Sequence, residues 1–259
     1  MEIYLQIGEH LAFITYQSSF IKAFFERNYL SISLNRIQFD MSLNILADYG
    51  VPFTNYDVEI IRDKNKITYR RADYLIETTQ DYKQATIHVH DELALKHALM
   101  NFYSAFILHN NWGLLIHSSC VVEEGNAHIF TGRSGAGKST AAKLSAPRVL
   151  LSDEATLVKI APEGITVFNS PFRSELKVTG KETSTPLVSI QLLRQALFNS
   201  RNQLKKSDAV LNLMDKVFYW VHCPEETKKI MYLLLSLVDK VSVYDLHFQK
   251  NDTFWELIS

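Results

Sequence analysis

The chain has 259 residues, of which 47% are hydrophobic, and its 27 Lys and Arg residues nearly balance its 28 Asp and Glu residues. This length and apolar content suffice for one large domain or two small ones, and the balanced charge gives no indication of a nucleic-acid partner. The opening segment has no cationic start and apolar run, no apolar segment approaches the ~20 residues that span a bilayer, and two cysteines are too few for a disulfide scaffold. We therefore expect a soluble protein of the reducing cytoplasm with no membrane partner.

Residues 1–90 are expected to form a small β-rich N-terminal part. Short runs of β-branched and aromatic residues, several with period-two alternation, predict strands there. These runs cover residues 11–17, 58–62, 67–71, 73–79 and 85–90. An extra module of this kind suits a large substrate, so we expect it to border a peptide-binding groove. Tyr69, Arg70 and Arg71 are candidate lining residues, and a solvated strand edge is the alternative for them.

Residues 91–259 are expected to form the core of the protein. After Asp91 the apolar residues recur at helical spacing, and two strands joined by a turn at residues 124–126 follow. Next come a glycine-rich loop, a short helix and the buried strand "RVLLSDE". Beyond Pro186 the apolar spacing predicts mainly helices, before a last strand "SVYDLHF". Those helices are expected over residues 187–200, 207–221 and 225–241. The predicted fold is α/β (α+β), a mixed sheet core with a helical C-terminal cap.

The glycine-rich loop matches the P-loop pattern G-x-x-x-x-G-K-[ST] and lies between a predicted strand and a predicted helix. Its residues are Gly132, Arg133, Ser134, Gly135, Ala136, Gly137, Lys138, Ser139 and Thr140. The glycines let backbone N–H groups form an anion nest, and the positive end of the new helix adds to it. Lys138 can reach the β- and γ-phosphates and Ser139 can ligate Mg²⁺, so the loop predicts binding of a nucleoside triphosphate. The alternative is a chance match in a structural turn.

Two carboxylates follow the loop closely. Asp153 and Glu154 end the strand that comes after the short helix, and the carboxyl ends of strands in such sheets face the ligand crevice. We therefore expect both acids beside the γ-phosphate. There, carboxylates hold Mg²⁺ or accept the proton of an attacking hydroxyl. A pair that only holds the metal is the alternative.

Other nucleotide-binding motifs are missing from the sequence. The segment "NLMD", Asn212 to Asp215, lacks the lysine of the guanine motif N-K-x-D. No D-x-x-G switch follows the P-loop, and no ABC-type motif such as LSGGQ occurs. These absences disfavour a GTPase switch and an ABC motor.

The segments "LLIHSS", "IFTGRSGAGKST", "LLSDE" and "SPFRSE", in this order, resemble the HPr kinase/phosphorylase superfamily over residues 114–175. That superfamily shares its P-loop core with ATP-dependent phosphoenolpyruvate carboxykinases. The resemblance implies a core like the HPr kinase C-terminal domain, with ATP and Mg²⁺ as cofactors. It implies that Asp153 accepts the proton of a substrate serine, that Lys138 contacts phosphate and that His117 helps to form the site.

The metal ligands and a further cation also come from these segments. The resemblance implies that Ser139 and Glu175 hold Mg²⁺, and Glu154 is the further candidate from the acidic pair. Arg173 can neutralise transferred charge, as arginines near a γ-phosphate do. A surface arginine is the alternative for Arg173, and a structural histidine is the alternative for His117.

The chain is more similar to the smaller HPr-kinase-like proteins encoded with lasso peptide biosynthesis. They combine a β-rich N-terminal part with an "HSS" segment, the same P-loop, an "SPF…E" segment and a late "FW". This resemblance implies ATP-dependent phosphorylation of the C-terminal serine of a precursor peptide. The alternatives are a phosphotransferase acting on another protein or on a small molecule such as free serine, and a non-catalytic ATP-binding regulator. A relative in the HPr kinase family is hexameric, and apolar faces on the C-terminal helices would permit a homo-oligomer here.

Overall fold

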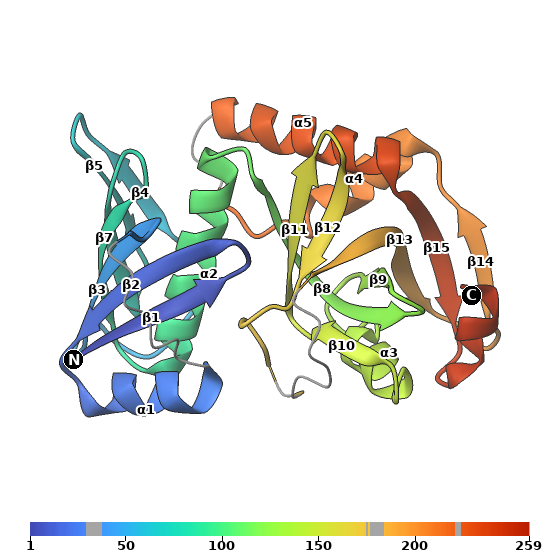
Figure 1. The fold of residues 1–259 in the computed structure, drawn as a ribbon, viewed down its shortest axis with the longest axis horizontal. Helices are drawn as coiled ribbons and strands as arrows, with labels where there is room; N and C mark the ends of the chain where they lie inside the picture. The colour runs from blue at the N-terminus through green and yellow to red at the C-terminus, as the bar shows by residue number, and fades with distance from the viewer. Residues whose placement is uncertain (30–37, 175, 177–183, 221–223, 259) are drawn as a thin grey trace. The chain divides into compact units, whose positions relative to one another are not determined.

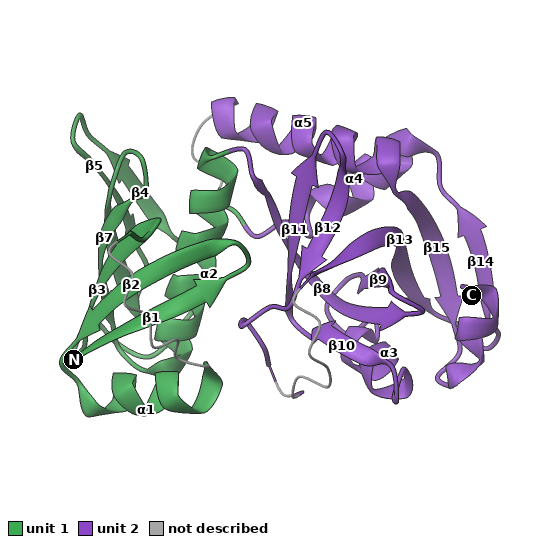
Figure 2. Cartoon of the chain, in the orientation of Figure 1, with its two compact units in different colours: residues 1–110, 219–222 green, residues 111–218, 223–259 purple. Residues whose placement is uncertain are grey.

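The protein divides into two compact units. The computed structural model describes residues 1–29, 38–174, 176, 184–220 and 224–258. Unit 1 comprises residues 1–110 and 219–222, and unit 2 comprises residues 111–218 and 223–259 (Figure 2). In the described part of the chain, no helix has the length and apolar character needed to cross a membrane.

The boundary between the units follows a helix rather than preceding it. The sequence predicts a boundary near residue 91, with the helix in the core. In the structure, helix α2 (Glu92–His109) packs against β6 (Tyr74–Thr79) and β7 (Gln84–Val89), which are strands of unit 1. The Asp91 carboxylate accepts a hydrogen bond from the Ala94 N–H and caps this helix. The chain passes into unit 2 after α2 because the buried side chains of α2 belong to the first core.

Unit 1 is built on one mixed sheet (Figure 1), whose described strands run in the order β1-β2-β3-β7-β6-β5-β4. The β2–β3 and β3–β7 pairs are parallel, and the remaining pairs are antiparallel. The other elements are β1 (Glu2–Ile7), β2 (His10–Tyr16), α1 (Ser19–Asn28), β3 (Met41–Leu46), β4 (Glu59–Arg62) and β5 (Lys66–Arg70). The structure confirms the strands predicted for residues 1–90, and it adds β1, α1 and β3.

The candidate groove residues of unit 1 are mostly buried. Tyr69 is inaccessible to solvent, and its hydroxyl lies 2.5 Å from that of Tyr82. Arg71 is also buried, where its Nε donates a hydrogen bond of 2.6 Å to the Asp73 carboxylate. Arg70 alone is exposed and pairs with Glu59. Tyr69 and Arg71 are therefore core residues, and neither the groove lining nor the solvated edge describes them.

Unit 2 contains the P-loop and is also built on a mixed sheet. Its described strands follow the path β10-β8-β11-β12-β13-β15-β14, and β9 pairs with both β8 and β13. The strands are β8 (Gly113–Glu123), β9 (Asn126–Thr131), β10 (Val149–Ser152), β11 (Ala155–Ala161), β12 (Gly164–Phe168), β13 (Ser184–Gln195), β14 (Ser200–Gln203) and β15 (Ser242–Phe248). The helices are α3 (Lys138–Leu144), α4 (Lys206–Met214), α5 (Pro224–Lys240) and the 3₁₀ helix η1 (Asp252–Leu257).

The helical C-terminal cap predicted beyond Pro186 is wrong in its first part. Residues 187–195 belong to β13, which pairs in parallel with both β9 and β15. A short, mainly apolar run that is buried on both faces has the same appearance in a helix and in a central strand, and residues 190–193, among which only Gln191 is polar, form such a run. The C-terminal part therefore supplies three strands of the P-loop sheet, together with α4, α5 and η1.

The short P-loop helix is fixed by the end of the chain. Ala141 and Ala142 of α3 belong to one buried cluster with Phe248, Phe254 and Trp255. The indole N–H of Trp255 donates a 3.1 Å hydrogen bond to the hydroxyl of Ser145, which caps α3. Because seven residues are too few for a helix to be stable alone, this packing determines the position of α3.

Candidate functional site

The P-loop and the two carboxylates lie at the same edge of the sheet because of how three strands pair. Strand β8 lies between β9 and β10 and is antiparallel to both, so β9 and β10 run in the same direction. Strand β9 ends at Thr131 and leads into the P-loop, while β10 ends at Ser152 and leads into Asp153 and Glu154. The carboxyl ends of these two strands therefore bring the loop and the acids together.

The backbone of the P-loop requires glycine at the start of α3. Gly137 has a φ of 109°, in a region that side chains with a Cβ rarely adopt. A Cβ at this position would also lie 2.8 Å from the ring of Phe248. Any other residue at position 137 would therefore be strained and would have to displace the Phe248 ring of β15.

Lys138 is the buried cation of the loop. Its Nζ donates hydrogen bonds to the backbone carbonyls of Gly132 (3.2 Å) and Arg133 (3.3 Å). Burial lowers the pKa of Lys138, and the nearby charge of Lys216 lowers it further. No carboxylate is recorded beside this ammonium among the described residues. A phosphate group would supply the negative charge that the Lys138 ammonium lacks.

A cavity of about 350 Å³ lies between the P-loop and the acids, and we call it the phosphate cavity. It is lined by His117, Ser134, Gly135, Gly137, Lys138, Ser139, Thr140, Asp153, Glu154 and Ser174. The structure therefore brings together the predicted lysine, the predicted Mg²⁺-binding hydroxyl and both predicted carboxylates. Gly132, Arg133 and Ala136 do not line this cavity; they line a second one, described below.

Asp153 is held in place by the chain segment that follows β12. The N–H of Ser174 donates to Asp153 Oδ1 (3.0 Å), and the Ser174 hydroxyl and the Leu176 N–H donate to Oδ2 (3.0 and 2.9 Å). Only 3% of Asp153 is exposed. These three bonds fix the orientation of the carboxylate, which also lines the phosphate cavity.

The candidate metal ligands fit a magnesium ion that arrives with a nucleotide. Ser139 and Glu154 line the phosphate cavity, and Mg²⁺ in such sites takes one or two carboxylates besides phosphate oxygens and water. Among the described residues, no group of three or more His, Cys, Asp or Glu side chains could hold a metal by itself. Glu175, the other predicted ligand, lies outside the described residues.

His117 is neutral in its environment. It lies on β8, lines the phosphate cavity and packs its ring against Phe218. Burial lowers the pKa of His117 to about 4, and the charges of Lys138 and Lys216 contribute to the shift. At neutral pH the imidazole therefore offers one donor and one acceptor to the cavity.

Arg173 is half-buried and not a surface residue. Its Nη2 donates to the carbonyl of Leu151 (2.9 Å) and to the side-chain oxygen of Asn169 (2.6 Å). Its Nε and Nη1 are buried and have no hydrogen-bond partner within the described ranges. Burial lowers the pKa of Arg173 and the charge of Asp153 raises it, which means that the guanidinium is close to this acid. It does not line the phosphate cavity, so its contact with a transferred phosphoryl group stays a prediction.

Lys216 is a candidate site residue that the sequence analysis missed. It follows α4, where the backbone pairs with β8: the His117 N–H donates to the Lys216 carbonyl (2.7 Å), and Ile116 forms a bridge with Val217. Only 8% of Lys216 is exposed. Its ammonium pairs with Asp215 at 2.5 Å, and its charge acts on both Lys138 and His117. Nothing in the local sequence of α4 indicates this position, because the pairing joins distant segments.

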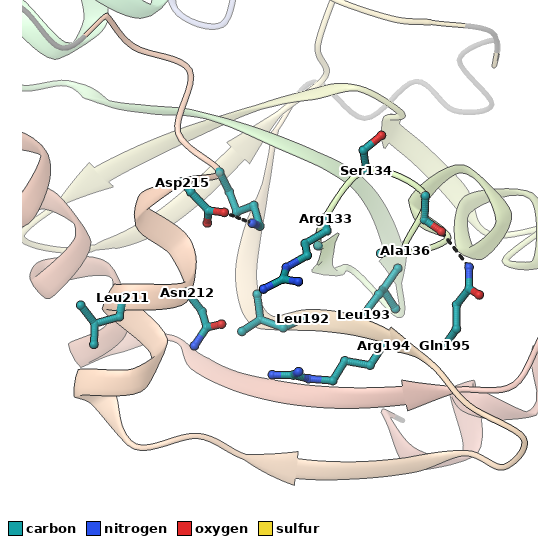
Figure 3. Close-up of a pocket in the computed structure, with 13 residues that line it drawn as sticks. Arg133, Ser134, Ala136, Leu192, Leu193, Arg194, Gln195, Leu211, Asn212 and Asp215 are labelled. Atoms are coloured by element: carbon teal, nitrogen blue, oxygen red, sulfur yellow. Dashed lines mark hydrogen bonds and ion pairs between the residues drawn. The ribbon is translucent and has the colours of Figure 1, made fainter.

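A second cavity, of about 610 Å³, lies on the other side of the P-loop, and we call it the outer cavity (Figure 3). It shares Ser134 and Gly135 with the phosphate cavity. The Gln195 side chain, at the carboxyl end of β13, donates a 2.7 Å hydrogen bond to the Gly135 carbonyl. The rest of its lining comes from Gly132, Arg133, Ala136, Leu192, Leu193, Arg194, Leu211, Asn212, Asp215 and Lys216.

Comparison with known proteins gives one family. The model of the SynChlorMet cassette protein ScmC matches residues 80–259. The chain belongs to the ScmC family. The ScmC match includes β7, α2 and the whole of unit 2, and therefore both cavities and every site residue discussed above. A search of curated proteins finds no relative of the chain.

Proposed function

We propose that this protein is an ATP- and Mg²⁺-dependent kinase with an HPr kinase-like core, and that it phosphorylates a serine hydroxyl of a peptide, the C-terminal serine of a precursor peptide. The observation that carries the proposal is the lining of the phosphate cavity. Lys138 and Ser139 of the P-loop lie there beside Asp153 and Glu154. The choice of a C-terminal serine is supported by the resemblance described above.

In the proposed reaction the serine oxygen attacks the γ-phosphorus of ATP in line with the bond to the bridging oxygen. The new O–P bond forms as the old one breaks, ADP leaves, and the hydroxyl proton passes to Asp153. Mg²⁺, held by Ser139 and Glu154, would neutralise charge on the phosphates. Lys138 and the loop amides stabilise the negative charge on the phosphoryl oxygens.

The arrangement of Asp153 suits a base that positions the hydroxyl more than it activates it. Phosphoryl transfer through a loose transition state asks for little proton abstraction before attack. The three hydrogen bonds from Ser174 and Leu176 keep the carboxylate in one orientation. Such fixed orientation is what converts a bound pair of reactants into a productive geometry.

The assignment is tested by two substitutions with separate expected results. Asp153→Asn should keep ATP binding and lower kcat by about 10²- to 10⁴-fold, whereas Lys138→Ala should lose ATP binding. Thermal unfolding of Asp153→Asn checks that the loop it anchors remains folded. Near-normal turnover of a folded Asp153→Asn variant would show that Asp153 is not the base.

A further inference from the structure

The outer cavity is lined by apolar and cationic side chains that phosphate binding does not need. Leu211 on α4 is 71% exposed, although it lines a cavity beside the P-loop. The guanidinium of Arg133 has no recorded partner in the described part of the chain, and Arg194 uses its Nε to pair with Asp245 at 2.6 Å. Figure 3 shows the two arginine side chains pointing into the same space, with Asn212 facing them from α4 and Leu211, which also lines the cavity, beyond Asn212. An exposed apolar side chain opposite planar cations suits a flat aromatic ligand.

The direction of a bound triphosphate is set by the acids. The phosphoryl group that is transferred must lie beside Asp153 and Glu154, which follow β10. Strand β13, whose carboxyl end lines the outer cavity, is on the other side of the P-loop strand β9. The remaining end of the nucleotide therefore leaves the loop on the β13 side.

The residues that line the outer cavity from Lys216 back to Leu211 on α4 follow the same direction, from the phosphates to the nucleoside. Lys216 lies next to the phosphate cavity, because its carbonyl accepts the N–H of His117, a residue that lines that cavity. Asp215, with its side chain 69% exposed, comes next, and Asn212 and Leu211 lie one helical turn further back. The cation of Lys216 matches a phosphate and the carboxylate of Asp215 matches a ribose. The amide of Asn212 and the apolar side chain of Leu211 match a base. Carboxylates bind ribose hydroxyls in other nucleotide sites.

We propose that the outer cavity is the nucleoside site, in which Asp215 accepts hydrogen bonds from the ribose hydroxyls and the base lies between Leu211 and the guanidinium groups of Arg133 and Arg194. This inference rests on the proposed nucleotide-dependent function. It assigns a ligand to "NLMD", a segment that matches no guanine motif. It also assigns the outer cavity to the nucleotide and not to the phosphoryl acceptor.

The test compares ATP with inorganic tripolyphosphate, which has the phosphates and no nucleoside. Both are titrated by calorimetry, with Mg²⁺, into the wild-type protein and into Asp215→Ala and Leu211→Ala. Asp208→Ala is the matched control, because Asp208 is on α4 and does not line the cavity. We expect wild type to bind ATP more tightly than tripolyphosphate, and each cavity variant to reduce that ratio by about 3- to 10-fold. Asp208→Ala should leave it unchanged.

The results separate the inference from the function on which it rests. An unchanged ratio in both cavity variants, or a wild-type ratio near one, would overturn the nucleoside site. A raised KM for the peptide acceptor with that unchanged ratio would assign the cavity to the acceptor instead. Failure of wild type to bind either ligand would overturn the proposed nucleotide site, and the inference with it. ATP binding that depends on Asp215 and Leu211, without phosphoryl transfer, would support the inference and contradict the kinase.

Discussion

Replacement of Lys216 by glutamine tests how much the charge of a residue outside the P-loop contributes to ligand affinity. The substitution keeps most of the side-chain volume and removes one charge from a site where two lysines lie close together. Asp215 would lose its partner, but 69% of its side chain is exposed, so water replaces the ammonium at little cost. The effect on ligand affinity therefore reports mainly on the proposed contact between Lys216 and phosphate.

The expected magnitude follows from the burial of Lys216. Only 9% of its side chain is exposed, which limits screening by solvent and salt. A hydrogen bond to a charged partner contributes about 1.5–3 kcal/mol, and two unit charges about 6 Å apart interact by about 3 kcal/mol at an effective dielectric constant near 20. Either value corresponds to a loss of roughly 10- to 100-fold in affinity.

Calorimetric titration with ATP and with tripolyphosphate measures this loss. We expect Lys216→Gln to weaken the binding of both ligands by a similar factor, because both carry the phosphates beside which we propose that Lys216 lies. Lys206→Gln is the matched control, since Lys206 is exposed on α4 and pairs with Asp239, and it should bind both ligands as wild type does. Affinities for both ligands within twofold of wild type in Lys216→Gln would refute the argument.

Three further predictions concern the P-loop and its surroundings. Gly137→Ala should abolish tripolyphosphate binding in the same titration, because φ is 109° and the added Cβ would lie 2.8 Å from the Phe248 ring. Trp255→Ala should lower the free energy of unfolding in urea by about 3–5 kcal/mol through loss of its buried contacts. The exposed Tyr232→Ala should change it by no more than about 0.5 kcal/mol. His117 has a folded pKa of about 4 against an ordinary value of 6.5; the unfolded chain therefore binds a proton that the folded protein excludes, and stability should fall as pH drops from about 6.5 to 4. His117→Gln should show a shallower fall in urea titrations across that window, and an identical slope would contradict the buried neutral imidazole.

Much of the site could be predicted because its signals are local. The P-loop pattern lies in an uninterrupted strand–loop–helix segment, and Asp153 and Glu154 directly follow the next strand. Alternation and β-branched residues likewise predict β5, β6 and β7. These features depend on neighbours in the sequence, and the structure confirms where they lie.

The missed features depend on contacts between distant segments. Burial of β13 on both faces, between β9 and β15, gives "LVSIQLLRQ" a pattern that also suits a helix. Lys216 lines the outer cavity and lies next to His117 only because its segment pairs with β8. Tyr69 and Arg71 are buried by a polar and aromatic network that no periodicity indicates. In each case tertiary packing decides what the local pattern leaves open.

The most direct test of the proposed function is phosphoryl transfer to a peptide. The purified protein is incubated with ATP, Mg²⁺ and a pool of synthetic peptides of varied sequence that end in serine, and the products are analysed by mass spectrometry. We expect the addition of one phosphoryl group, which is absent with Asp153→Asn and with a matched pool ending in alanine. Binding of ATP without any phosphorylated peptide would contradict the proposed function.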